Sequence, residues 1–144
     1  MVSVLEQMQA SSLVGLGKVM LARLKIRNNE KDVDVDSLYA YARNNKVKIY
    51  EGSISYLMGA IFLDIDDQHM PEAEDWIRKA IEADQRNGMR FRLGQDHALY
   101  AEFFKRKGDR EQARENLGKA IELFRECGAD GWVKKHEEEL ARLG

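Results

Sequence analysis

The sequence predicts an all-α protein built as a stack of helical hairpins, and three observations support that prediction. Apolar residues recur three and four positions apart along most of the chain, which is the spacing of one covered helix face. Glycines follow three of these stretches, at Gly88, Gly108 and Gly128, where helices commonly end. The letters KAIE occupy residues 79–82 and recur at residues 119–122, an offset of 40 that is typical of a helical repeat.

The N-terminal half predicts three helices. Residues 2–28 carry apolar side chains at helical spacing and form one helix or two, ending at the Asn28-Asn29 pair. A second helix runs to about residue 46. The aspartates at positions 32, 34 and 36 mark its start, because negative charge stabilises the exposed N–H groups of a first turn. A third helix covers about residues 50–63.

The next two helices are delimited by proline and glycine. A helix over residues 71–87 begins with Pro71, whose missing N–H is not needed at the first helical position. Gly88 caps that helix in the left-handed conformation. The following helix covers about residues 91–107 and is capped by Gly108 in the same way.

The last two helices close the chain. Asp109 is placed to cap the N-terminus of a helix that ends at Gly128, with Gln112 three residues on as in a capping box. A final helix over residues 131–143 has one apolar side and one charged side. Such an end helix is what a stack of hairpins requires to stop growing.

Length and charge restrict the class of protein. The 144 residues are 44% hydrophobic and 33% charged, with a net charge of −2, which favours a single globular domain. Neither half of the chain has the basic excess that nucleic acid or an anionic membrane requires, and no stretch is long and apolar enough for a membrane span. We also expect no signal peptide. The one cysteine, Cys127, excludes an internal disulfide and fits a cytoplasmic protein.

The helix pairs resemble the tetratricopeptide repeat (TPR) family. Its pattern has a small residue and an aromatic late in the first helix, then alanine, a bulky residue and alanine in the second. The best match is Ala101, Phe104, Ala113, Leu117 and Ala120, followed by Gly59, Phe62, Ala73, Ile77 and Ala80, and loosely by Gly17, Met20, Val35, Tyr39 and Ala42. The family's aromatic-leucine signature is replaced by His97 and Tyr100 in the best repeat. The long period is similar to that of C-terminal regions of signalling proteins, including bacterial nucleotide cyclases and regulatory ATPases.

The resemblance implies a right-handed α-solenoid of about three hairpins, with approximate repeats over residues 11–48, 50–88 and 89–128 and a capping helix over residues 131–143. Its concave groove would be lined by the first helix of each pair and would bind a partner peptide or domain. The implied lining residues are Val14, Lys18, Leu21, Tyr56, Ala60, Leu63, Gln95, Ala98, Glu102 and Lys105. The Lys/Asn clamp of chaperone-binding members is missing at Tyr56, Ala60, Ala98 and Glu102, so that class of partner is not expected.

The sequence leaves three functions open, and none is enzymatic. No nucleophile, acid–base pair or metal-ligand spacing stands out, so we expect no catalytic residue, no metal and no cofactor. The first hypothesis is a protein–protein interaction module. The second is a ligand-sensing or regulatory domain of a larger signalling protein. The third is a homodimer formed through exposed apolar residues of the first hairpin, such as Leu13, Leu16 and Met20.

Trp76 has two interpretations. It corresponds to Asn116 in the next repeat, so the repeat itself does not require an aromatic ring at this position. Trp76 is therefore either a partly exposed packing residue or an interface residue that contacts a partner, because exposed tryptophans often anchor interfaces.

Overall fold

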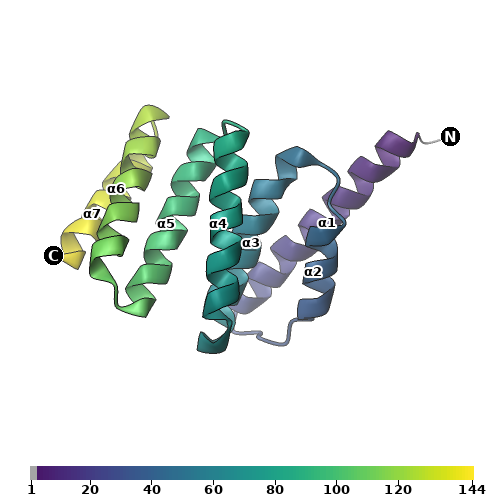
Figure 1. Cartoon of the computed structure of the whole chain (residues 1–144), viewed down its shortest axis with the longest axis horizontal. Helices are drawn as coiled ribbons and strands as arrows, with labels where there is room; N and C mark the ends of the chain where they lie inside the picture. The colour runs from purple at the N-terminus through teal and green to yellow at the C-terminus, as the bar shows by residue number, and fades with distance from the viewer. Residues whose placement is uncertain (1–2) are drawn as a thin grey trace. The chain divides into compact units, whose positions relative to one another are not determined.

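The computed structural model describes residues 3–144, and every regular element in that range is helical, so the all-α prediction is confirmed (Figure 1). Residues 2–28 were expected to form one helix or two; a single helix is found, and Val2 lies outside the described residues. The second helix ends three residues earlier than predicted. The helices are α1 (Val4–Arg27), α2 (Val35–Arg43), α3 (Lys48–Ile65), α4 (Met70–Arg86), α5 (Arg90–Lys107), α6 (Arg110–Glu126) and α7 (Asp130–Leu143), with a single 3₁₀ turn at Asp67–His69.

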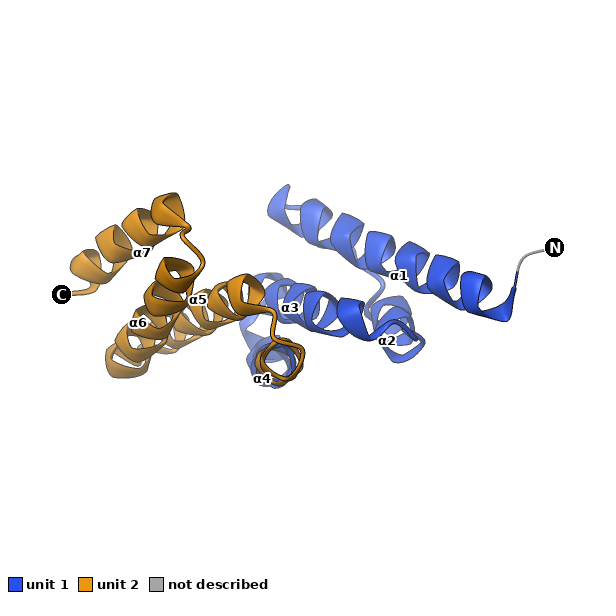
Figure 2. Ribbon diagram, turned by 90° about the horizontal axis from the view of Figure 1, so that it is seen from above, with its two compact units in different colours: residues 1–80 blue, residues 81–144 orange. Residues whose placement is uncertain are grey.

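The chain divides into two compact units, coloured separately in Figure 2. The first comprises Met1–Ala80 and the second Ile81–Gly144. The division falls inside α4, which contributes most of its length to the first unit and its last turns to the second. The predicted second repeat, residues 50–88, is therefore shared by the two units.

Short polar side chains cap the first turns of α1, α2 and α6 by accepting hydrogen bonds from free backbone N–H groups. Ser3 and Glu6 form a reciprocal capping box on α1, with the Glu6 N–H donating to Ser3 Oγ over 3.1 Å. Of the three aspartates expected to start the second helix, Asp34 is the cap. The hydroxyl and backbone N–H of Ser37 donate to its carboxylate and lower the pKa of Asp34. Asp109 caps α6 as predicted, accepting the Gln112 N–H over 3.1 Å.

Four helices end in the same backbone motif, in which one residue takes a positive φ and the next N–H reaches back five residues. At the end of α5, Gly108 has a φ of 84° and the Asp109 N–H donates to the Phe104 carbonyl over 2.9 Å. Glycine and asparagine serve here because they enter the left-handed region at the lowest cost. The residues in this position are Asn29, Gly88, Gly108 and Gly128.

In the first unit, α3 contacts α1, α2 and α4. Its fully buried side chains include Met58, Ile61 and Phe62. An ion pair between Arg23 and Asp64 joins the C-terminal ends of α1 and α3, so these two helices run in the same direction. The close approach of α3 to α4 depends on Gly59, because the position its missing Cβ would take lies 2.8 Å from a side-chain carbon of Ile77.

In the second unit, α5 and α6 form an antiparallel hairpin, and α7 packs against α6. The ring of Phe91, near the start of α5, lies edge-on to Trp132, near the start of α7, with 5.2 Å between ring centroids. Further along, the Lys105 ammonium lies 3.1 Å from the Glu139 carboxylate. The first contact joins residues near the start of each helix, and the second joins residues further along both. α7 therefore runs parallel to α5.

Replacing Gly59 by alanine is expected to destabilise the protein. The added Cβ would lie 2.8 Å from Ile77 Cγ1 and 3.3 Å from the Ile77 backbone nitrogen, neither of which is the free end of a side chain. Overpacking of this kind costs about 1–3 kcal/mol, more than the roughly 1 kcal/mol that alanine gains in helix propensity. Urea unfolding followed by circular dichroism measures the change.

Gly118→Ala is the matched control for Gly59→Ala, because no atom lies within 4 Å of the Cβ that it would add to α6. This variant is expected to be stabilised by about 0.5–1 kcal/mol, since only helix propensity changes. Equal unfolding midpoints for the two variants would contradict the packing described for Gly59.

Candidate functional site

The residues predicted to line a groove in the second unit lie on one face of α5. Gln95, Ala98, Glu102 and Lys105 are spaced three and four residues apart, and all four are half-buried. Phe91 continues the same face toward the start of the helix. We call these five residues the α5 stripe. Its side chains are neither enclosed in the core nor fully extended into solvent, so the stripe is accessible to a partner.

Ion pairs hold one end of the α5 stripe in place. Lys105 interacts with Glu102 over 3.3 Å and with Glu139 of α7 over 3.1 Å. Burial alone would lower the pKa of Lys105, but the two carboxylates raise it, so the ammonium stays charged at neutral pH. Arg106 also contacts Glu102, over 3.2 Å. This end of the stripe therefore presents fixed charges of both signs.

The residues predicted to line the groove in the first unit are divided between surface and core. Lys18 and Leu21 are exposed on α1, as is Val14, and Tyr56 on α3 is half-buried. Ala60 and Leu63 are buried, at 1% and 4% exposed, and offer no surface to a partner. α3 packs against α1, α2 and α4, which leaves these two positions inside the unit instead of along a channel.

Trp76 is half-buried on α4 within the first unit. Its ring lies 6.1 Å from that of Tyr39, and the Lys79 ammonium sits 4.3 Å from its centroid. These contacts give the ring a packing role within the chain. A role as an interface residue stays a prediction.

The outward face of α1 is the most apolar exposed surface of the first unit. Its five large side chains are between 47% and 60% exposed, whereas the opposite face of the same helix is buried. Large clustered apolar surface of this kind is typical of an interaction site. The residues of this outward face are Ala10, Leu13, Val14, Gly17, Met20, Leu21 and Leu24.

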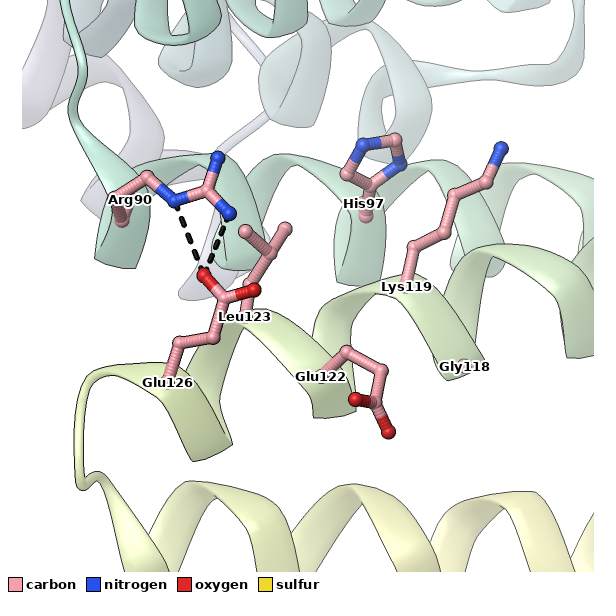
Figure 3. A pocket seen from close by; sticks show the side chains of 7 residues that line it. All are labelled: Arg90, His97, Gly118, Lys119, Glu122, Leu123 and Glu126. Atoms are coloured by element: carbon pink, nitrogen blue, oxygen red, sulfur yellow. Dashed lines mark hydrogen bonds and ion pairs between the residues drawn. The ribbon is translucent and has the colours of Figure 1, made fainter.

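A shallow hollow of about 510 Å³ lies between α5 and α6, and the sequence analysis did not identify it (Figure 3). We call it the α5–α6 hollow. At one end, Arg90 binds the Glu126 carboxylate through its Nη2 over 2.5 Å and its Nε over 3.2 Å. The residues lining it are Arg90, His97, Gly118, Lys119, Glu122, Leu123 and Glu126. Arg90 and Glu126 are 36 positions apart, a separation that no local pattern reveals.

His97 is held as a neutral ring at the wall of the α5–α6 hollow. The Asn116 amide donates to the Gln112 carbonyl over 3.0 Å, which leaves its oxygen to accept a hydrogen bond from His97 Nδ1, also 3.0 Å away. Burial lowers the pKa of His97; the hydrogen bond to Asn116 opposes this, and the positive charge of Lys119 adds to the lowering. At neutral pH the remaining ring nitrogen, Nε2, is thus a hydrogen-bond acceptor.

Two carboxyls, Asp84 of α4 and Asp96 of α5, are buried as neighbours within the second unit. Each residue is 1% exposed. As carboxylates, Asp84 Oδ2 and both Asp96 oxygens would lack any hydrogen-bond donor. A proton on Asp96 would supply a donor to the neighbouring Asp84. Burial raises the pKa of Asp96 far above its ordinary value and the neighbouring Asp84 raises it further, while the charge of Arg92 opposes both effects.

The repeat shows why the acid pair sits there. An offset of 40 residues matches Asp84, Arg92 and Asp96 to Phe124, Trp132 and His136. The second set also meets in space, with ring centroids 5.3 Å apart for Phe124 and Trp132 and 5.0 Å apart for Phe124 and His136. Aligning the two repeats would have pointed to the aspartates, which otherwise look like ordinary surface acids.

Comparison with protein-family models, curated proteins and solved structures finds no match for this chain. None of the helices described over residues 3–144 has the length and apolar character needed to cross a bilayer. Within the same residues, no three His, Cys, Asp or Glu side chains come together as a set of metal ligands. The function therefore has to be argued from the surfaces described above.

Asp96→Asn is expected to flatten the pH dependence of stability. Because the folded-state pKa is raised above the unfolded value of 3.8, the native chain holds a proton that the unfolded chain has lost. The contribution of Asp96 to the free energy of unfolding is therefore largest below about pH 4. It falls as the pH rises, by up to about 1.4 kcal/mol per pH unit for one proton. The asparagine amide donates to Asp84 without titrating. Urea unfolding at pH 5, 7 and 9 measures the slope.

The control for this substitution is Asp75→Asn, which removes an exposed carboxylate from α4. It is expected to keep the wild-type slope of unfolding free energy against pH. A slope unchanged in Asp96→Asn would show that the pair holds no extra proton in the folded state.

Proposed function

We propose that this chain is a non-catalytic protein-binding module of the tetratricopeptide-repeat kind, a right-handed solenoid of about three hairpins in the cytoplasm. The observation that carries the proposal is the α5 stripe, an accessible helix face beside the parallel helix α7. Parallel helices with intervening antiparallel ones occur in both units: α1 with α3, and α5 with α7. This order supports a repeat in which the first helices of successive pairs share one side.

The chemistry of the α5 stripe fits a peptide with both apolar and charged side chains. Phe91 and Ala98 offer apolar contacts, and Gln95 offers an amide that pairs with backbone groups. Lys105, Glu102 and Glu139 present both signs of charge at one end. Charged side chains of a peptide lying along the stripe would pair with these residues in place of the ion pairs within the chain. Because one set of ion pairs replaces another, the exchange contributes more to specificity than to affinity.

Ala98→Arg is expected to block peptide binding, because the large side chain covers the middle of the α5 stripe. Peptides selected from a random display library on the wild-type chain serve as probes, with affinities measured by fluorescence polarisation. Binding is expected to weaken at least tenfold, which corresponds to about 1.4 kcal/mol. Circular dichroism confirms that the variant is folded.

Ala141→Arg is the matched control, because it places the same side chain at an exposed position of α7 away from the α5 stripe. The selected peptides are expected to bind this variant with wild-type affinity. Equal binding to both variants, or the absence of any selected peptide, would contradict the proposed function.

The α5–α6 hollow favours a second function, sensing of a small molecule by a regulatory domain. A volume of about 510 Å³ lies in the range of small-ligand sites, and its lining supplies cations, carboxylates and the neutral His97. A metabolite that binds there stabilises the folded chain and so raises its melting temperature. At a concentration 100 times the dissociation constant, the free energy of unfolding rises by about 2.7 kcal/mol. A thermal-shift screen tests this, and the shift should disappear in Lys119→Ala. A shift that Lys119→Ala retains would place the ligand elsewhere.

A further inference from the structure

The outward face of α1 has the regular spacing of a helix–helix seam. Five of its residues follow one another at alternating intervals of four and three positions: Ala10, Val14, Gly17, Leu21 and Leu24. Leu13 and Met20 flank this line and are also exposed. Alternation of three and four is the pattern by which one straight helix packs along another. Apolar spacing of this kind has no use on a solvated surface.

This seam is symmetric about Gly17. When two copies of α1 are placed antiparallel with their Gly17 residues together, Ala10 faces Leu24 of the second copy, Leu13 faces Leu21 and Val14 faces Met20. Small residues therefore meet large ones at the ends of the seam. At Gly17 the added Cβ would meet nothing within 4 Å, so the glycine is not required by packing within its own chain. Its missing side chain leaves room for a second helix to approach closely.

The charges of α1 also favour the antiparallel arrangement. Residues 4–14 contain one charged side chain, Glu6, whereas residues 15–27 contain four basic side chains and no acidic one. A parallel pair would bring the two basic halves together. An antiparallel pair places each basic half beside the half that carries Glu6 and opposes the two helix dipoles.

We propose that the outward face of α1 binds a second copy of this chain, forming a two-fold dimer through an antiparallel α1–α1 pair. A two-fold interface uses one patch on both partners, so the patch has to complement itself. The α1 seam does so in both side-chain size and charge. This proposal does not depend on peptide binding by the α5 stripe.

A second apolar region extends the interface. A hollow of about 560 Å³ lies between the N-terminal part of α1 and the start of α3. Its lining combines the polar Glu6 and Gln9 with the largely apolar Ala10, Leu13, Val47, Ile49 and Tyr50. Ile49 is itself half exposed. In the antiparallel pair the second copy's Leu24 lies beside Ala10, at the edge of this hollow. The apolar part of this hollow therefore gives the end of the second helix further surface to cover.

The size of the seam predicts a dimer of moderate affinity. Its five large side chains are each about half exposed, so two copies bury on the order of 1,000 Å² in total, near the lower limit for specific complexes. We therefore expect monomer and dimer to exchange in the micromolar range. Sedimentation velocity between about 1 and 200 μM should show the weight-average mass rising from one copy to two.

Leu21→Asp tests the face, and Leu5→Asp is its matched control. Leu21 lies in the seam, while Leu5 is an exposed leucine of the same helix that points away from the seam. Leu21→Asp is expected to remain monomeric over the whole concentration range, whereas Leu5→Asp should dimerise like the wild type. A wild-type chain that stays monomeric at 200 μM, or a dimer that survives Leu21→Asp, would overturn the proposal.

Cysteine cross-linking tests the antiparallel direction. Cys127 is exposed, so both variants carry Cys127→Ala. Ala10→Cys and Leu24→Cys chains are expected to form a disulfide-linked dimer when mixed and oxidised, and much less of one when either is oxidised alone. Cross-linking of each variant only with itself would overturn the antiparallel pairing. A monomer in these experiments leaves peptide binding by the α5 stripe unaffected, because Ala98→Arg tests that site separately.

Discussion

The contact between the end of α6 and the start of α7 organises the second unit. At this position the buried Phe124 and His136 pack against the more exposed ring of Trp132, and His136 Nδ1 donates to the Trp132 carbonyl over 2.7 Å. The cluster fixes α7 against α6 and parallel to α5. The position of α7 in turn gives the α5 stripe its neighbour, so the accessible face depends on this buried contact.

The same position one repeat earlier is occupied by two buried carboxyls instead of aromatic rings. Asp84 and Asp96 meet where Phe124 and His136 meet 40 residues later. Both contacts join the end of one helix to the helix that follows, but they differ in whether they contain carboxyl groups. The ring contact between Phe124 and Trp132 involves no carboxyl group, whereas the acid pair becomes charged as it loses its proton, and two charged carboxylates repel each other.

Local chemistry made the helix boundaries predictable from the sequence. Asp109 and Gly108 act through hydrogen bonds to residues at most five positions away, so the cap and the left-handed turn follow from neighbouring letters. The burial of Ala60 and Leu63 did not follow from the sequence in this way. It depends on which distant helices cover α3, and helical spacing shows that a face is apolar without showing what packs on it.

The α5–α6 hollow and the acid pair were missed for a similar reason. Arg90 and Glu126 come together only once α5 and α6 are folded against each other, and neither has an unusual sequence context. Asp84 could have been found by aligning the repeats, because an acid aligned with a core phenylalanine signals a buried charge. That inference compares one repeat with the next, whereas the groove residues were taken from the family resemblance by their position in each repeat.

α1 and α7 differ in what they present on the side away from their own unit. α7 carries exposed lysine and glutamate side chains at residues 134, 135, 137 and 138, and this polar side needs no partner. α1 carries its apolar seam on the side opposite its buried face. A helix that is apolar on both sides is usual inside a stack and costly at a surface. When the α1 seam packs against the seam of a second copy, one contact covers the apolar face of both chains. No apolar seam is then left to bind a third copy, so assembly stops at the dimer.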